Sequence, residues 1–151
     1  GLGGSITTFG TANGDPYDTL DGEVVDDDLA TWLGLQTGPS PPLGISATYD
    51  PSALTITESW NQIAQTTAVT KGEDADGNPL IDTPKTWVIG SSGFGGKKPM
   101  TVTYEPTGCG RVMFSVYQTS NEPHASLFPQ ERILLYLLLE IGACVNDIPI
   151  E

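Results

Sequence analysis

The residues of this chain that are best suited to chemistry are two cysteines and one histidine. Cys109 lies between two glycines in "EPTGCGRVMFSVYQTS", Cys144 ends the most apolar segment, and His124 lies between them in the loop "SNEPHAS". A thiol acts as a nucleophile when a base lies within hydrogen-bond reach, and His124 is the only histidine that could serve. A metal site needs three or four ligands, so two cysteines and one histidine are a sparse set. A disulfide needs only that the two cysteines meet.

We expect Cys109 and Cys144 to form that disulfide. A strand expected over residues 111–119 covers about 30 Å, and a helix expected over residues 129–143 returns about 21 Å in the opposite direction. The connecting loop can make up the difference and bring the two cysteines to the same end. An even number of cysteines in a chain poor in lysine is also typical of an oxidising compartment.

Three consecutive aspartates, Asp26, Asp27 and Asp28, are a weaker candidate for a cation site. They directly precede an apolar segment that carries leucines and a tryptophan on one helical face. An aspartate at this place caps a helix, and further acidic residues complement the helix dipole. We therefore expect a short helix near residues 27–34, with the aspartates at its start rather than around a metal ion.

Asp74 and Asp76 form a second weak metal candidate in the segment "GEDADGNPLID". The spacing is similar to that of a calcium loop. With Gly77 at position six of an EF-hand, however, Gly72 would stand at position one and Thr83 at position twelve, and neither supplies a carboxylate. The turn residues favour the tip of a β-hairpin instead. No cofactor is expected.

The composition indicates a β-rich domain with few cations. The chain has 151 residues, of which 17% are charged, and it contains 18 glycines, 12 prolines and six lysines and arginines for a net charge of −13. Nucleic-acid binding needs a basic patch, so that class of function is excluded. The longest apolar segment, residues 133–145, is interrupted by Glu140 and is shorter than the ~20 residues that span a bilayer. We expect no membrane insertion.

The positions of the turn-forming residues predict a turn-rich arm over residues 1–22, with one short β run at residues 5–9. The rest of the chain, residues 23–151, is predicted to form a single domain. Turns are expected at Asn13-Gly14, Asp15-Pro16 and Asp21-Gly22. The proline-rich stretch "TGPSPPLG" predicts a connector without regular structure. Strands are expected around "ISATYD", "ALTITESW", "QIAQTTAVTKG", residues 87–89 and residues 100–104, with the glycine-rich "GSSGFGG" as a surface loop.

The end of the chain predicts the most buried elements. "RVMFSVYQT" is almost continuously apolar, as in a strand that is buried on both faces. The helix of "FPQERILLYLLLEIGAC" is apolar nearly all the way round, which predicts that Leu135 and Leu138 lie in the core. The fold class is therefore α/β or α+β, with a β-rich sheet and a buried C-terminal helix packed on it.

The segments "VTYEPTGCGRVMFSVYQTS" and "PQERILLYLLLEIGAC" resemble the last strand and helix of secreted domains of the class I glutamine amidotransferase-like (ThuA-like) family. "GEVVDDDLATWLG" also resembles a segment of those domains. The resemblance implies a parallel sheet with helices on its faces, here an incomplete flavodoxin-like sheet that lacks its first strands. Active members carry a nucleophile elbow after an early strand, which is missing here. Gln118 stands where related sequences often have histidine.

These observations predict a non-catalytic, extracellular or cell-surface structural module whose partners are proteins, either copies of itself or other chains of an assembly. The start at Gly1 adds the expectation of a removed leader or of a piece of a longer protein. One alternative is a degenerate amidotransferase-like hydrolase that uses Cys109 and His124. Another is a glycan-binding module that uses Trp60 or Trp87 as a stacking platform.

The disulfide is open to a direct test. Alkylation of the denatured, unreduced protein should add no label, and alkylation after reduction should add two, as measured by intact mass. The bond would close a loop of about 35 residues and contribute roughly 3 to 4 kcal/mol in the chain-entropy model. Two labelled thiols without reductant would contradict the pairing of Cys109 with Cys144.

Overall fold

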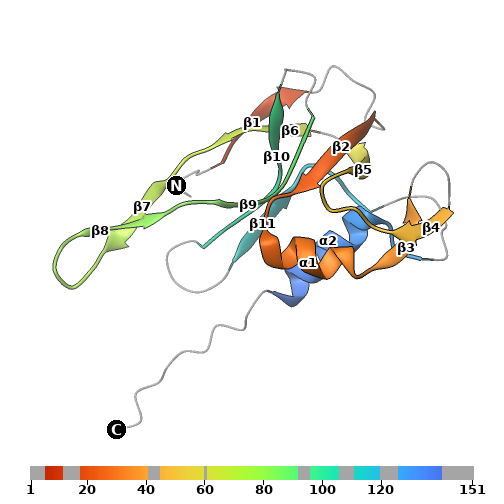
Figure 1. Ribbon diagram of the computed structural model, residues 1–151. Coiled ribbons are helices and arrows are strands. Elements are labelled where there is room, and N and C mark those ends of the chain that lie inside the picture. Colours follow the sequence, from red (N-terminus) through yellow and green to blue (C-terminus); the bar gives the residue numbers. More distant parts are fainter. Residues whose placement is uncertain are drawn as a thin grey trace, which may run out of the picture.

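The computed structural model describes residues 6–11, 18–40, 45–59, 61–91, 96–105, 111–119 and 126–140. These ranges form a mixed α/β fold that is rich in strands, which confirms the expected fold class (Figure 1). The elements in chain order are β1 (Ile6–Thr11), β2 (Asp18–Val24), α1 (Asp27–Gly34), β3 (Thr37–Ser40), β4 (Ile45–Thr48), β5 (Leu54–Ser59), β6 (Asn61–Thr66), β7 (Val69–Glu73), β8 (Pro79–Asp82), β9 (Lys85–Ser91), β10 (Lys97–Tyr104), β11 (Val112–Ser115) and α2 (Pro129–Leu139).

The main sheet has five strands in the order β11-β10-β9-β2-β5, and each neighbouring pair is antiparallel. Just after β11, Tyr117 forms a β-bridge with Ser59 at the end of β5, so the sheet curls until its two edges approach. The parallel sheet that the family resemblance implied is wrong for these strands. The physical reason is the short connection between β9 and β10, because parallel neighbours need a crossover of a dozen or more residues.

The core lies between one side of the curled sheet and the two helices, which pack side by side (Figure 1). The main contributions come from aliphatic and aromatic residues of β5, β9, β10, α1 and α2. Its buried hydrophobic residues are Val24, Leu29, Leu33, Tyr49, Leu54, Ile56, Ile63, Trp87, Val88, Met100, Val102, Val116, Tyr117, Ile133 and Leu137.

The first helix forms where the sequence predicts it. The carboxylate of Asp26 accepts a hydrogen bond from the backbone N–H of Leu29 at 2.8 Å, which is an N-terminal cap. Asp27 and Asp28 lie in the first turn, where negative charge complements the helix dipole. Leu29 and Leu33 are fully buried, so α1 contributes one apolar face to the core.

The second helix departs from the prediction in how it is buried. Ile133 and Leu137 are buried, as expected for positions one turn apart on the face towards the core. Leu135, Leu138 and Leu139 are 39%, 56% and 75% exposed, so the prediction that Leu135 and Leu138 lie in the core is wrong. The sheet and α1 cover only one side of α2, and an apolar residue on its other side therefore meets solvent.

Three further expectations are corrected by the strands. β11 is an edge strand with an exposed Val112, not a strand buried on both faces. Residues 37–40 of the proline-rich stretch form β3, which pairs only with β4, and an edge strand tolerates Pro39 because its outer side needs no N–H donor. Asp21 and Gly22, expected in a turn, lie within β2, which spans the boundary expected at residue 22.

The β7–β8 hairpin confirms the interpretation of the "GEDADGNPLID" segment. The Asp74 carboxylate accepts hydrogen bonds from the backbone N–H groups of Asp76 and Asn78, and Gly77 takes a positive φ of 81° that favours glycine. Among the described residues, no helix is both long enough and apolar enough to cross a membrane.

A buried glutamine joins α2 to the open edge of the sheet. The side-chain oxygen of Gln130 accepts the Thr57 N–H at 2.9 Å, and its nitrogen donates to the Thr57 carbonyl at 3.0 Å and to the Gln118 carbonyl at 2.7 Å. Gln130 is fully buried. Its amide thus makes the same pair of hydrogen bonds to β5 that a residue of a neighbouring antiparallel strand would make.

We predict that Gln130→Leu lowers the free energy of unfolding by about 3 kcal/mol, because it removes three hydrogen bonds to part-buried backbone groups of Thr57 and Gln118. Urea denaturation followed by circular dichroism measures the change. The matched control is Gln65→Leu, at an exposed position in β6, which should stay within about 0.5 kcal/mol of wild type. Equal stability of the two variants would contradict the role given to Gln130.

Candidate functional site

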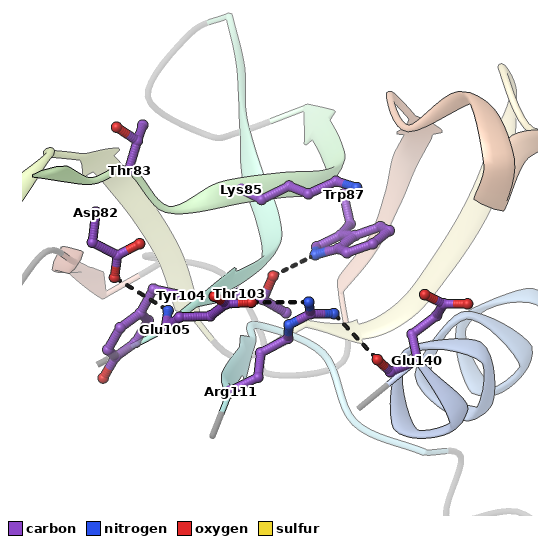
Figure 2. A pocket seen from close by; sticks show the side chains of 9 residues that line it. All are labelled: Asp82, Thr83, Lys85, Trp87, Thr103, Tyr104, Glu105, Arg111 and Glu140. Carbon is purple, nitrogen blue, oxygen red and sulfur yellow. Dashed lines mark hydrogen bonds and ion pairs between the residues drawn. The ribbon is translucent and has the colours of Figure 1, made fainter. Parts of the chain in front are cut away.

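The described residues form a cavity of about 290 Å³ where β8, β9 and β10 approach the end of α2 (Figure 2). We call it the Trp87 cavity. Its lining combines two aromatic side chains with two cations, three carboxylates and several hydroxyl groups. The lining residues are Asp82, Thr83, Lys85, Trp87, Thr103, Tyr104, Glu105, Arg111 and Glu140.

Lys85 and Trp87 lie two residues apart on β9, so the pleat of the strand puts both side chains on the same face. The Lys85 ammonium lies 3.6 Å from the centroid of the Trp87 ring, a cation–π contact. It also forms an ion pair with the Asp26 carboxylate at 2.7 Å. One ammonium group therefore rests on an aromatic face and beside a carboxylate, and Figure 2 shows Lys85 stretched towards the indole.

The ion pair is reflected in the pKa of Asp26. Burial opposes the charged form of this carboxyl group, but hydrogen bonds from Lys85 and from the Leu29 N–H, together with the charge of Lys85, outweigh burial and hold the pKa below its ordinary value. Asp26 is therefore ionised at neutral pH. Its carboxylate both caps the N-terminus of α1 and forms the ion pair with the Lys85 ammonium.

Trp87 is held in place by a hydrogen bond and by an aromatic contact. Its Nε1–H donates to the Thr103 hydroxyl at 2.8 Å, and its ring meets that of Tyr136 edge-on at 6.4 Å between centroids. Tyr136 in turn packs against Trp32 of α1 at 5.2 Å. Trp87 is only 3% exposed, so it offers no open face as a platform for a sugar.

Arg111 forms the opposite side of the cavity. Its guanidinium donates to the Glu105 carboxylate at 3.0 Å and to the Glu140 carbonyl at 3.3 Å (Figure 2). The second contact satisfies a carbonyl at the C-terminus of α2, where positive charge complements the helix dipole. The Glu105 N–H donates to the Asp82 carboxylate at 3.1 Å, which ties this side to the base of the β7–β8 hairpin.

Of the described residues that the sequence singled out, Trp87 lines this cavity and the others lie elsewhere. Cys109, Cys144, His124 and Trp60 lie outside the described residues. The two groups of aspartates are far apart in the fold, at the start of α1 and at the tip of the β7–β8 hairpin, and no cluster of three metal-ligating side chains occurs in the described ranges. Gln118 lies beyond β11 and accepts a hydrogen bond from Gln130 through its carbonyl oxygen.

Sequence reasoning missed Lys85, Arg111 and Glu140. The pair "KTW" at residues 85–87 did carry a usable signal, because a cation and an aromatic residue at i and i+2 of a strand share one face. Nothing local indicates that Arg111 meets the end of α2. That contact depends on how residues 29 positions apart come together in the fold.

Comparisons of this chain with protein-family models, curated proteins and solved structures give no match. The resemblance to amidotransferase-like domains therefore remains an inference from the sequence segments that carry it.

The Asp26 ion pair gives a prediction about pH. Because the folded-state pKa of Asp26 lies below that of the unfolded chain, its charged form stabilises the fold above the ordinary carboxyl range near pH 4, and this contribution is lost as the pH falls through the folded-state pKa. Asp26→Asn keeps a good helix cap but removes the charge. It should lower the free energy of unfolding by up to about 1 kcal/mol at pH 7, and this deficit should vanish at low pH.

Urea denaturation of wild type and Asp26→Asn across pH 2 to pH 7 measures the deficit. Asp27→Asn, an exposed position in the same first turn, serves as the control. A deficit of the same size at both ends of the pH range would show that the charge of Asp26 does not cause it.

Proposed function

We propose that this chain is a non-catalytic structural module that acts through protein–protein contacts, within an extracellular or cell-surface assembly that contains further copies of it. The observation that carries the proposal is the exposed side of α2. Leu135, Leu138 and Leu139, which we call the leucine stripe, are spaced at i, i+3 and i+4 and form one apolar strip on the solvent side of the helix.

The leucine stripe is a second apolar face on a helix that already buries Ile133 and Leu137 on its first. Single exposed leucines are normal on protein surfaces, whereas adjoining exposed apolar residues are typical of surfaces that bind another protein. A helix with two apolar faces is expected where one face meets its own domain and the other meets a neighbour.

The β7–β8 hairpin adds independent support. It projects from the sheet on the side away from the helices (Figure 1), and Leu80 and Ile81 on β8 are exposed. A two-stranded ribbon gains little stability on its own. Apolar side chains on such a projecting ribbon suit a contact with a neighbouring subunit.

The two rival functions receive less support. A glycan platform needs an accessible aromatic face. The face of Trp87 carries Lys85, and Trp60 lies outside the described residues. The hypothesis of a degenerate hydrolase depends on Cys109 and His124, which lie outside the described residues. The extracellular location rests on the composition and on the expected disulfide.

We expect light scattering to report more than one chain per particle at physiological salt, with and without calcium. The apparent mass should rise with salt, because a net charge of −13 opposes self-association when screening is weak. Leu138→Glu should return the protein to a monomer by placing a charge in the leucine stripe.

The control is Leu35→Glu, which adds the same charge at a site just beyond α1 that is 78% exposed. It should leave the mass unchanged. A wild-type monomer in all these conditions, or equal effects of the two substitutions, would contradict the proposal.

A further inference from the structure

The contact between Lys85, Trp87 and Asp26 has the form of an occupied binding site. An ammonium group lies over an indole face and beside a carboxylate, which is the arrangement by which proteins recognise ammonium ligands. Here the ammonium belongs to the protein itself. Asp26 and Trp87 are held in place more firmly than Lys85. The Asp26 side chain is 12% exposed and Trp87 is fixed by Thr103, whereas the Lys85 side chain is 52% exposed.

The surroundings favour positive charge. Tyr136 adjoins Trp87, and its pKa is raised by burial and by the negative charges of Glu140, Asp26 and Asp28. These carboxylates come from α1 and from the end of α2, so they act on the same surface from two sides. A cation that replaced Lys85 would meet the same negative field.

The Trp87 cavity supplies room for a ligand larger than an ammonium group. Lys85 and Trp87 form part of its wall, and Thr103, Tyr104 and Glu105 line the space beyond them (Figure 2). A cation held at Trp87 can therefore extend a polar tail into a pocket that offers hydroxyl and carboxylate groups, of which the Glu105 carboxylate is paired with Arg111.

Lys85 can leave this place easily. Its side chain is long, flexible and 52% exposed, so water can take over the solvation of its ammonium group when the ion pair and the cation–π contact break. Its departure would uncover one face of Trp87 and leave Asp26 as an unpaired carboxylate. Both consequences make the vacated place attractive to another cation.

We propose that Asp26, Trp87 and the Trp87 cavity form a binding site for an organic cation with a quaternary ammonium head, and that Lys85 occupies this site as an internal stand-in until the ligand displaces it. A quaternary head is weakly hydrated, so it loses less than a lysine ammonium on moving from water to the indole face. It cannot donate a hydrogen bond to Asp26 and depends on the aromatic face and on the carboxylate charge. The proposal is independent of the assembly function proposed above.

The test is a titration of the full chain with tetramethylammonium chloride, with sodium chloride at equal concentration as the ionic-strength control. The readout is the NMR signal of the Trp87 indole N–H, which donates to Thr103 and is identified by its loss in Trp87→Phe. We compare wild type, Lys85→Ala and Lys97→Ala. Lys97 forms an exposed ion pair with Glu23, so both substitutions remove one positive charge from β9 or β10.

Lys85→Ala should bind tetramethylammonium roughly tenfold more tightly than wild type, because the internal competitor is gone. Lys97→Ala should bind like wild type. Lys85→Gln, which keeps a long polar side chain, provides a second variant if the alanine variant is unstable.

Equal affinities of the Lys85 and Lys97 variants would overturn the proposal, because general charge would then explain any gain. Absence of binding by the folded Lys85 variants would overturn it as well. So would unchanged affinity, measured by calorimetry, when Trp87→Phe or Asp26→Asn is added to Lys85→Ala.

Discussion

The arrangement of this molecule depends on one buried amide. Gln130 pairs with both backbone groups of Thr57 and also bonds the Gln118 carbonyl, so one side chain joins α2, β5 and the segment after β11. These are the two edges that approach when the sheet curls. Because Gln130 lies in the first turn of α2, it also sets where the rest of that helix runs. Tyr136, further along the same helix, thereby meets Trp87, and Glu140 at the end of the helix reaches the Trp87 cavity.

The same amide limits how the protein can assemble. An open sheet edge is a template for pairing with another chain. A sheet that lacks its first strands, as the family resemblance implies, would have such an edge. At β5 the backbone groups of Thr57 are already bonded to Gln130, and Ser59 is bridged to Tyr117. Strand addition at these residues would have to displace a buried side chain. Side-chain surfaces, such as the leucine stripe, are therefore the more accessible means of association.

The sequence predicted the elements whose signals are local, and it failed where distant contacts decide. The cap at Asp26 and the hairpin tip at Asp74 need only neighbouring backbone groups, and both form as expected. The buried side of α2 could not be predicted, because leucines surround the helix and only its partners select a face. The role of Gln130 was equally hidden, since its partner Thr57 is 73 residues away. For the site, the spacing of Lys85 and Trp87 was readable, whereas the approach of Arg111 to α2 was not.

The acidity of the chain and the geometry of the Trp87 cavity together decide where the protein attracts cations. Of the six lysines and arginines, Lys85, Lys97 and Arg111 each form an ion pair with a carboxylate. In a chain with 19 acidic residues and six lysines and arginines, removing such a cation leaves a carboxylate that few other basic residues can neutralise. At most sites water and counterions solvate that charge. At Asp26 an aromatic face lies beside it, and this pairing adds affinity for an organic cation over a hydrated metal ion. Composition thus makes the surface attractive to cations in general, and Trp87 makes one place on it selective.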